Sequence, residues 1–110
     1  MMLEDEQARW RRVKELFGEA ATAFRAVREV RTREADPRGW AMTQQDLGQI
    51  LEALGDLGDD PEGRYAEGLA CLDGALQVFA DGDIKANWAT CARSRARMLR
   101  KLAAWPSAES

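Results

Sequence analysis

The sequence contains no histidine, and this absence removes several kinds of chemistry at once. Histidine supplies the base of Ser-His and Cys-His nucleophiles and is a ligand in most zinc sites. The acidic loop Asp56, Asp59, Asp60 and Glu62 could attract a cation, but it lacks the alternating ligands and central glycine of a calcium loop. We therefore expect a protein that is not an enzyme and that holds no cofactor and no metal.

Long apolar runs are also missing. No stretch approaches the roughly 18 apolar residues that cross a bilayer, and the N-terminus, MMLEDEQARW, is acidic and unlike a secretory signal. The chain has only 2 cysteines, Cys71 and Cys91, whereas a secreted domain of this size usually carries more bridges. We expect no membrane contact, a cytoplasmic location and two cysteines that act as small apolar fillers.

Proline and β-branched residues are scarce, and Ala, Leu, Arg and Glu dominate. These four residues are strong helix formers because they lose little rotamer freedom in a helix. The 110 residues suffice for one domain with one core, and 45% of them are hydrophobic. The composition therefore favours a single all-α domain.

Turn residues divide the chain into four helical segments. Segments of helical periodicity cover about residues 3–34, 40–54, 61–80 and 84–104, and no segment alternates with the period of a strand. The breaks are Asp36-Pro37, the loop from Gly55 to Asp60-Pro61, and Asp81-Gly82-Asp83, with Gly55 expected as a left-handed C-cap. Short connections favour antiparallel neighbours. We predict an all-α, antiparallel helix-turn-helix array of about four helices in one domain, residues 1–105, with a disordered tail over 106–110.

Apolar residues three and four apart predict the buried face of each helix. In the first helix they are Trp10, Val13, Leu16, Phe17, Ala20, Phe24, Val27 and Val30. The later helices offer Trp40, Leu47, Ile50, Leu51 and Leu54, then Tyr65, Leu69, Leu72, Ala75, Leu76 and Phe79, and finally Trp88, Cys91, Met98, Leu99 and Leu102. We expect these side chains, including all three tryptophans, to pack in the core, whereas Trp105 lies beyond the periodic segment and could contact a partner.

The chain repeats itself with a period of 48 residues. This shift superposes Trp40-Ala41 on Trp88-Ala89, Leu51 on Leu99, Leu54 on Leu102, Phe24 on Leu72 and Phe17 on Tyr65. A fixed period is typical of helical arrays, because one helix pair cannot cover its own apolar face and successive units share a core.

The repeat resembles the tetratricopeptide (TPR) family. Leu47, Gly48, Leu51 and Gly55 are similar to the first helix of that repeat, and Gly68, Leu72, Ala75 and Leu76 to its second helix. The similarity is greatest to a bacterial variant reading roughly TREADPxxWAxTQxxLG, which residues 32–37, 40–41, 43–44 and 47–48 match. The resemblance covers about residues 13–102 and implies an α-solenoid fragment with one whole repeat, formed by the second and third helices.

The last helix departs from the family pattern, because the Leu-Gly pair has become Arg95-Ala96. An exposed Arg95 would suit a terminal helix that no further helix covers, since capping units need a polar outer face. The alternatives are that the chain belongs to a longer array or pairs there with a second copy.

The resemblance also implies a binding groove, because the first helix of each TPR repeat lines a concave surface that holds a peptide or a helix. By position, the groove residues here are Met42, Gln45, Asp46, Gln49, Thr90, Arg93, Ser94, Arg97 and Arg100. Three of them, Arg93, Arg97 and Arg100, share one helix face and form either a site for carboxylates or a solvated surface. We expect a protein-protein interaction scaffold whose partner is a protein or peptide, and an acidic one if the three arginines form a site for carboxylates.

The net charge of −3 conceals a strong asymmetry. Residues 46–83 carry ten acids and one base, Arg64, whereas residues 85–101 carry six bases and no acid. The acidic middle and the lack of aromatic residues among the bases argue against nucleic acid. The alternative to an adaptor is a structural domain that forms homo-oligomers, with the basic last helix of one copy on the acidic middle of another.

Overall fold

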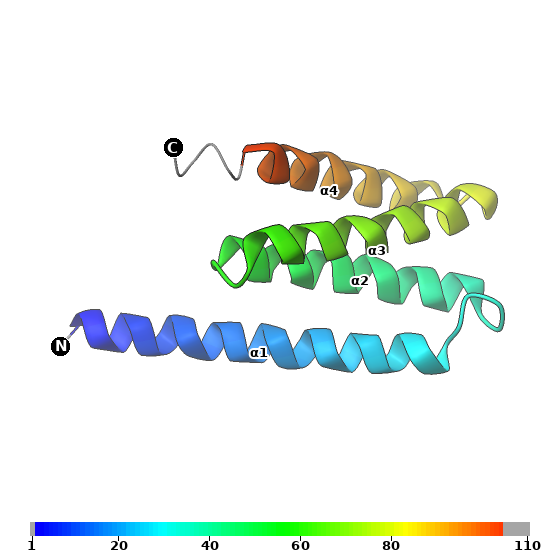
Figure 1. Ribbon diagram of the computed structural model, residues 1–110. Coiled ribbons are helices and arrows are strands. Elements are labelled where there is room, and N and C mark those ends of the chain that lie inside the picture. Colours follow the sequence, from blue (N-terminus) through cyan, green and yellow to red (C-terminus); the bar gives the residue numbers. More distant parts are fainter. Residues whose placement is uncertain (1, 105–110) are drawn as a thin grey trace.

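The fold is an array of four antiparallel helices, as the sequence predicts (Figure 1). The computed structural model describes residues 2–104, with side chains from residue 4 onward; the predicted tail and Trp105 lie outside this range. The helices are α1 (Met2–Val30), α2 (Pro37–Asp56), α3 (Pro61–Asp81) and α4 (Lys85–Ala104). None of the described helices is both long enough and apolar enough to cross a membrane.

Two Asp-Pro pairs set where α2 and α3 begin. Pro37 and Pro61 each occupy the first turn, where the missing N–H of proline costs nothing. Asp36 caps α2, since its Oδ1 accepts a hydrogen bond from the Gly39 N–H at 3.0 Å. The prediction that the first helix runs to residue 34 is wrong: α1 ends at Val30, and the residues up to Asp36 form the connection.

The expected role of Gly55 as a left-handed cap is also wrong. Gly55 lies inside α2 and is buried, whereas the left-handed glycine is Gly58, with φ of +85°. A Cβ on Gly55 would lie 2.5 Å from Cε1 of Tyr65, so this glycine lets the two helices approach each other. Gly58 therefore supplies the left-handed residue of the turn, and Gly55 allows the close approach of α2 and α3.

Helix α3 is the centre of the molecule and packs on both α2 and α4. Leu72, Ala75 and Phe79 are buried in one cluster with Cys91 and Met98 of α4. On its other side, Cys71 packs with three buried leucines of α2, namely Leu47, Leu51 and Leu54. The predicted core of α2 and α3 is therefore largely observed, because these two helices have neighbours on both flanks.

The outer helices are less covered than their apolar patterns predict. In α1, Phe17 and Phe24 are only partly buried, and the one fully buried side chain described is Ala21, which was not predicted. Four of the predicted core residues are exposed, namely Trp10, Leu16, Val27 and Val30. The reason is geometric: α1 packs along one flank of the array, and no described element covers its other flank (Figure 1).

Trp40 and Trp88 begin α2 and α4 in the same way but differ in burial. Each is the fourth residue of its helix, and each N–H bonds the carbonyl four residues earlier, that of Asp36 or Ile84. Trp40 is partly buried over Gly74 of α3, whereas Trp88 is 45% exposed. The prediction that Trp88 and Leu99 lie in the core is wrong, because α4 has α3 on one flank only.

Candidate functional site

The predicted groove residues lie on α2 and α4, which run parallel to each other and both pack against α3 (Figure 1). Polar side chains join these two helices at both ends. Near their N-termini, Asn87 Nδ2 donates to Gln45 Oε1 at 2.8 Å. Near their C-termini, Arg97 and Lys101 of α4 reach Glu52 of α2.

Glu52 is the charged centre of this contact. Arg97 donates to its two carboxylate oxygens at 2.7 Å each through Nε and Nη2, and Lys101 Nζ donates to it at 2.8 Å. Only 8% of the Glu52 side chain is exposed. Burial raises the pKa of Glu52, but the hydrogen bonds from Arg97 and Lys101 outweigh burial and leave the pKa below its usual value. The carboxylate therefore stays ionised and holds α4 to α2.

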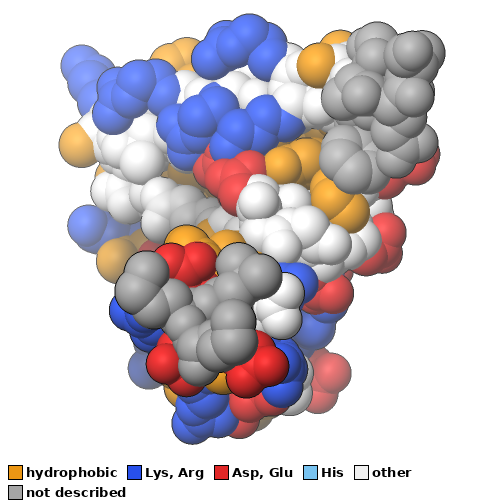
Figure 2. All heavy atoms as spheres, turned by 90° about the vertical axis from the view of Figure 1, so that its left-hand side faces the viewer, with side chains coloured by type: hydrophobic (Ala, Val, Ile, Leu, Met, Phe, Trp, Pro, Cys, Tyr) orange, Lys and Arg blue, Asp and Glu red, His pale blue; other side chains and the backbone are white. Residues whose placement is uncertain are grey.

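A second acid extends the same contact. Asp56 accepts from Lys101 Nζ at 3.0 Å and from the hydroxyl of Tyr65 at 2.7 Å. Burial and the neighbouring Asp56 raise the pKa of Tyr65, so its hydroxyl remains a donor. Figure 2 shows the Lys and Arg side chains of α4 gathered at the top, with acidic side chains directly beneath them. The acidic middle and the basic last helix thus pair within one chain.

Three of the nine predicted groove residues are occupied by contacts inside the molecule. Arg97 is bound to Glu52, Gln45 accepts from Asn87, and Ser94 is buried and accepts from Arg97 Nη2 at 3.3 Å. Sequence spacing could not reveal these contacts, because Glu52 falls outside the predicted groove and its partners lie 45 and 49 residues away.

The other six predicted residues remain accessible. Met42 is 47% exposed, and Asp46, Gln49, Arg93 and Arg100 are exposed, while Thr90 is half-buried. Within residues 4–104, the side chain of Arg93 makes one long hydrogen bond, at 3.4 Å to Thr90 Oγ1, and the side chain of Arg100 makes none. We call these six residues the α2/α4 face.

The α2/α4 face contains one carboxylate of altered acidity. Although Asp46 is exposed overall, nearby protein atoms withdraw water from its carboxylate and raise its pKa. Its charge also contributes to the raised pKa of Cys91, for which burial is the larger cause. The face therefore combines the carboxylate of Asp46 and an exposed methionine with two arginines that have no acidic partner in residues 4–104.

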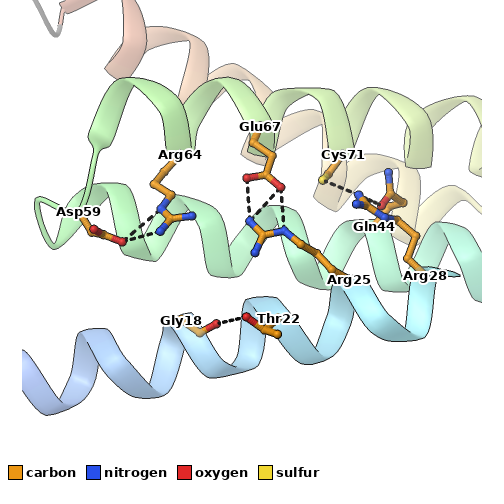
Figure 3. A network of polar contacts seen from close by, with 9 residues as sticks. All are labelled: Gly18, Thr22, Arg25, Arg28, Gln44, Asp59, Arg64, Glu67 and Cys71. Carbon is orange, nitrogen blue, oxygen red and sulfur yellow. Dashed lines mark hydrogen bonds and ion pairs between the residues drawn. The ribbon is translucent and has the colours of Figure 1, made fainter.

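A separate polar network, which the sequence did not reveal, joins α1 to the array (Figure 3). Arg25 donates to Glu67 of α3 through two of its guanidinium nitrogens, Nη2 at 2.8 Å and Nε at 3.1 Å. One turn on, Arg28 Nη1 donates to Gln44 Oε1 at 3.0 Å and lies 3.9 Å from Cys71 Sγ. All of these groups have partners, so this network is structural.

Neither cysteine is placed for chemistry at the surface. Cys71 and Cys91 are both buried and free, and burial raises the pKa of each thiol to about 11. Among the residues that the structure describes, no three His, Cys, Asp or Glu side chains are grouped so that they could hold a metal ion.

No family model, curated protein or solved structure matches this chain significantly. The assignment of a function therefore depends on the geometry above.

Proposed function

We propose that this chain is a protein-interaction module of tetratricopeptide type, whose α2/α4 face binds a peptide or helix from a partner that carries carboxylates. The observation behind this proposal is that Met42 of α2 and the arginines Arg93 and Arg100 of α4 are exposed, and that neither arginine has an acidic partner among the described residues. The proposal assigns the module no catalytic step and no cofactor, and places it in the cytoplasm.

Met42 and the arginines contribute differently to such binding. Exposed ion pairs are each worth about 0–1 kcal/mol, so Arg93 and Arg100 select and orient an acidic partner more than they hold it. Apolar contacts supply most of the affinity, and Met42 is suited to this because its unbranched side chain adapts to different surfaces. Arg97 contributes through Glu52, because their ion pair fixes the helix that carries the other two arginines.

The alternative of charge-driven homo-oligomers is less well supported. It requires the acids of α2 and α3 and the bases of α4 to meet between copies. Within one chain, however, Glu52 and Asp56 already bind α4, and Asp73 of α3 pairs with Arg95. Arg95, whose side chain is 42% exposed, is therefore also an ion-pair partner within the chain.

The test compares two charge-reversed variants of the chain as bait in cell lysate. Arg93→Glu with Arg100→Glu alters the α2/α4 face, while Arg11→Glu with Arg38→Glu makes the same charge change at other exposed positions. A partner that binds the α2/α4 face is retained by the wild type and by the control variant and lost from the first variant.

Titration calorimetry with the purified partner then gives the size of the effect. Two exposed pairs of up to about 1 kcal/mol each correspond to a loss of affinity of up to about 30-fold at low salt, shrinking as salt is added. Equal affinity for the wild type and Arg93→Glu/Arg100→Glu, with helical circular dichroism unchanged, would reject the proposed face.

A further inference from the structure

The two outermost helices, α1 and α4, each leave an apolar flank uncovered, at opposite edges of the array (Figure 1). On α4, exposed Trp88 and Leu99 form a shallow groove with Leu76 of α3. On α1, the exposed stripe consists of Leu16, Ala23, Val27 and Val30. We call these surfaces the α4 groove and the α1 stripe.

The α4 groove is the repeat counterpart of a surface that is buried elsewhere in the same molecule. The 48-residue shift relates Leu99 to Leu51 and Ala96 to Gly48 of α2. Leu51 is fully buried and Leu99 is 41% exposed, although both are leucines at the same place in the repeat. The difference is the neighbouring helix: α3 covers α2 at this flank, and no described helix covers α4.

The α1 stripe is in turn the counterpart of the surface that α3 uses to cover α2. Cys71 and Gly74 of α3 contact α2, the former among Leu47 and Leu51 and the latter against the Trp40 ring. The 48-residue shift relates Cys71 to Ala23 and Gly74 to Ala26 of α1, and both of these alanines are exposed. The chain therefore has two uncovered surfaces at opposite edges. The α4 groove corresponds to the α2 side of the α2/α3 contact, and the α1 stripe corresponds to the α3 side.

From this correspondence we propose that a second copy of the chain docks head to tail. The α1 stripe of one copy lies in the α4 groove of the next, antiparallel to α4 as α3 is antiparallel to α2. In this register Phe24 of the incoming copy lies over Ala96, as Leu72 lies over Gly48 within the chain. Because the two contacting surfaces differ, the arrangement adds further copies unless its rotation closes a ring.

Charge favours α1 of the second copy as the occupant over a second α4. Three of the six bases of α4, namely Lys85, Arg93 and Arg100, have no acidic partner among the described residues, so two α4 helices face to face would repel each other. Helix α1 carries six acids and six bases over Met2–Val30, and this balance places no excess positive charge against α4.

The contact between copies is weaker than the one within the chain. At Gly48 an added Cβ would lie 3.0 Å from the Leu72 side chain, and in α4 that position is Ala96. The incoming helix must therefore sit farther out than α3 does on α2, with fewer close contacts. Association consequently depends on protein concentration.

The experiment blocks each surface separately with one carboxylate and measures mass by analytical ultracentrifugation across a concentration series. Ala96→Glu blocks the α4 groove, and Ala23→Glu blocks the α1 stripe. Ala86→Glu adds the same charge at another exposed position of α4 and is the matched control. All four chains are first compared by circular dichroism to establish that they fold.

Head-to-tail docking makes a distinctive prediction for the mixture. Wild type and Ala86→Glu gain mass with concentration, whereas Ala96→Glu and Ala23→Glu each stay at the 12.3 kDa of one chain. Mixing the two blocked variants restores a single contact, so the mass rises to about twice that value and no further. None of the three substituted residues belongs to the α2/α4 face, so this outcome is independent of the proposed partner site.

Three results would overturn the inference. A wild type that remains monomeric into the millimolar range leaves the surfaces to another occupant, such as a partner helix. Dimers of Ala23→Glu alone mean that two α4 grooves meet. Dimers of Ala96→Glu alone mean that two α1 stripes meet.

Discussion

At the scale of single residues, Glu52 has a structural role that its place in the sequence does not reveal. It stands on α2 among residues of ordinary helical pattern, yet its carboxylate is buried and receives three hydrogen bonds from α4. A buried carboxylate without partners would cost several kcal/mol, so this arrangement is stable only while Arg97 and Lys101 are in place. Glu52 thereby links the position of α4 to pH.

We expect Glu52→Gln to lower the free energy of unfolding at pH 7 by about 1–3 kcal/mol, the range for hydrogen bonds to charged groups. The folded-state pKa of Glu52 is lowered, so its contribution is present above the unfolded value of about 4.3 and is lost as the pH falls through the folded pKa. The gap between variant and wild type in urea unfolding should therefore shrink as the pH falls below about 4.3.

Glu29→Gln is the matched control, because Glu29 is exposed and makes no hydrogen bond or ion pair with another described side chain. It should leave stability within about 0.5 kcal/mol of the wild type at pH 7. A gap for Glu52→Gln that is unchanged at low pH would mean that the ionised carboxylate is not what stabilises the fold.

At the scale of helices, the distance between neighbours is set by side-chain size at the contact. Glycines in α2 and α3 bring the backbones of these helices close together: Gly68 lies between Met98 of α4 and the carbonyl of Gly48. Gly18 in α1 has no side chain within 4 Å of the position that a Cβ would take. A glycine in a central helix therefore allows close packing, whereas Gly18 in an outer helix only weakens the helix.

Alanine substitution at Gly18 and at Gly55 should accordingly change stability in opposite directions. Gly18→Ala should raise the free energy of unfolding by about 0.5–1 kcal/mol, since alanine favours the helix and meets nothing. Gly55→Ala gains the same propensity but places its Cβ 2.5 Å from the Tyr65 ring, which the hydrogen bond to Asp56 restrains. We expect a net loss of about 1–3 kcal/mol.

Urea unfolding followed by circular dichroism measures both changes. A stabilising Gly55→Ala would show that Tyr65 moves aside freely and that the α2/α3 distance is not fixed by this contact.

At the scale of the whole molecule, stability is unevenly distributed because the array has a centre and two ends. Helix α3 packs on both α2 and α4, whereas α4 has an uncovered flank and meets α2 mainly through polar side chains. In helical arrays each unit is stabilised by its neighbours, so terminal helices open more often than central ones. The two cysteines report on this difference, one in α3 and one in α4.

We expect Cys91 to react with a thiol reagent faster than Cys71 at neutral pH. Burial raises the pKa of both thiols to about 11, so each must be exposed by opening before it forms a reactive thiolate. Peptide mass spectrometry at low protein concentration, where copies are separate, gives the two rates. In strong urea the rates should become equal, and faster labelling of Cys71 in the native state would contradict the order of opening.

The sequence by itself determined the number, type and approximate bounds of the helices. Helical periodicity and turn residues are local properties, so the Asp-Pro starts of α2 and α3 and the buried face of α3 follow from short stretches of chain. The same information indicated which helix positions carry the candidate binding residues, six of which are accessible.

Only the tertiary structure decided which apolar and charged side chains have neighbours. A periodic pattern marks a helix face but not the element that covers it, so Leu51 and Leu99 look alike in sequence and differ completely in burial. The same holds for charge: Arg97 and Arg100 are equivalent on a helix surface, yet only Arg97 meets a carboxylate, from a residue 45 positions earlier. Contacts between distant residues depend on how the helices pack, and that packing is a property of the whole array.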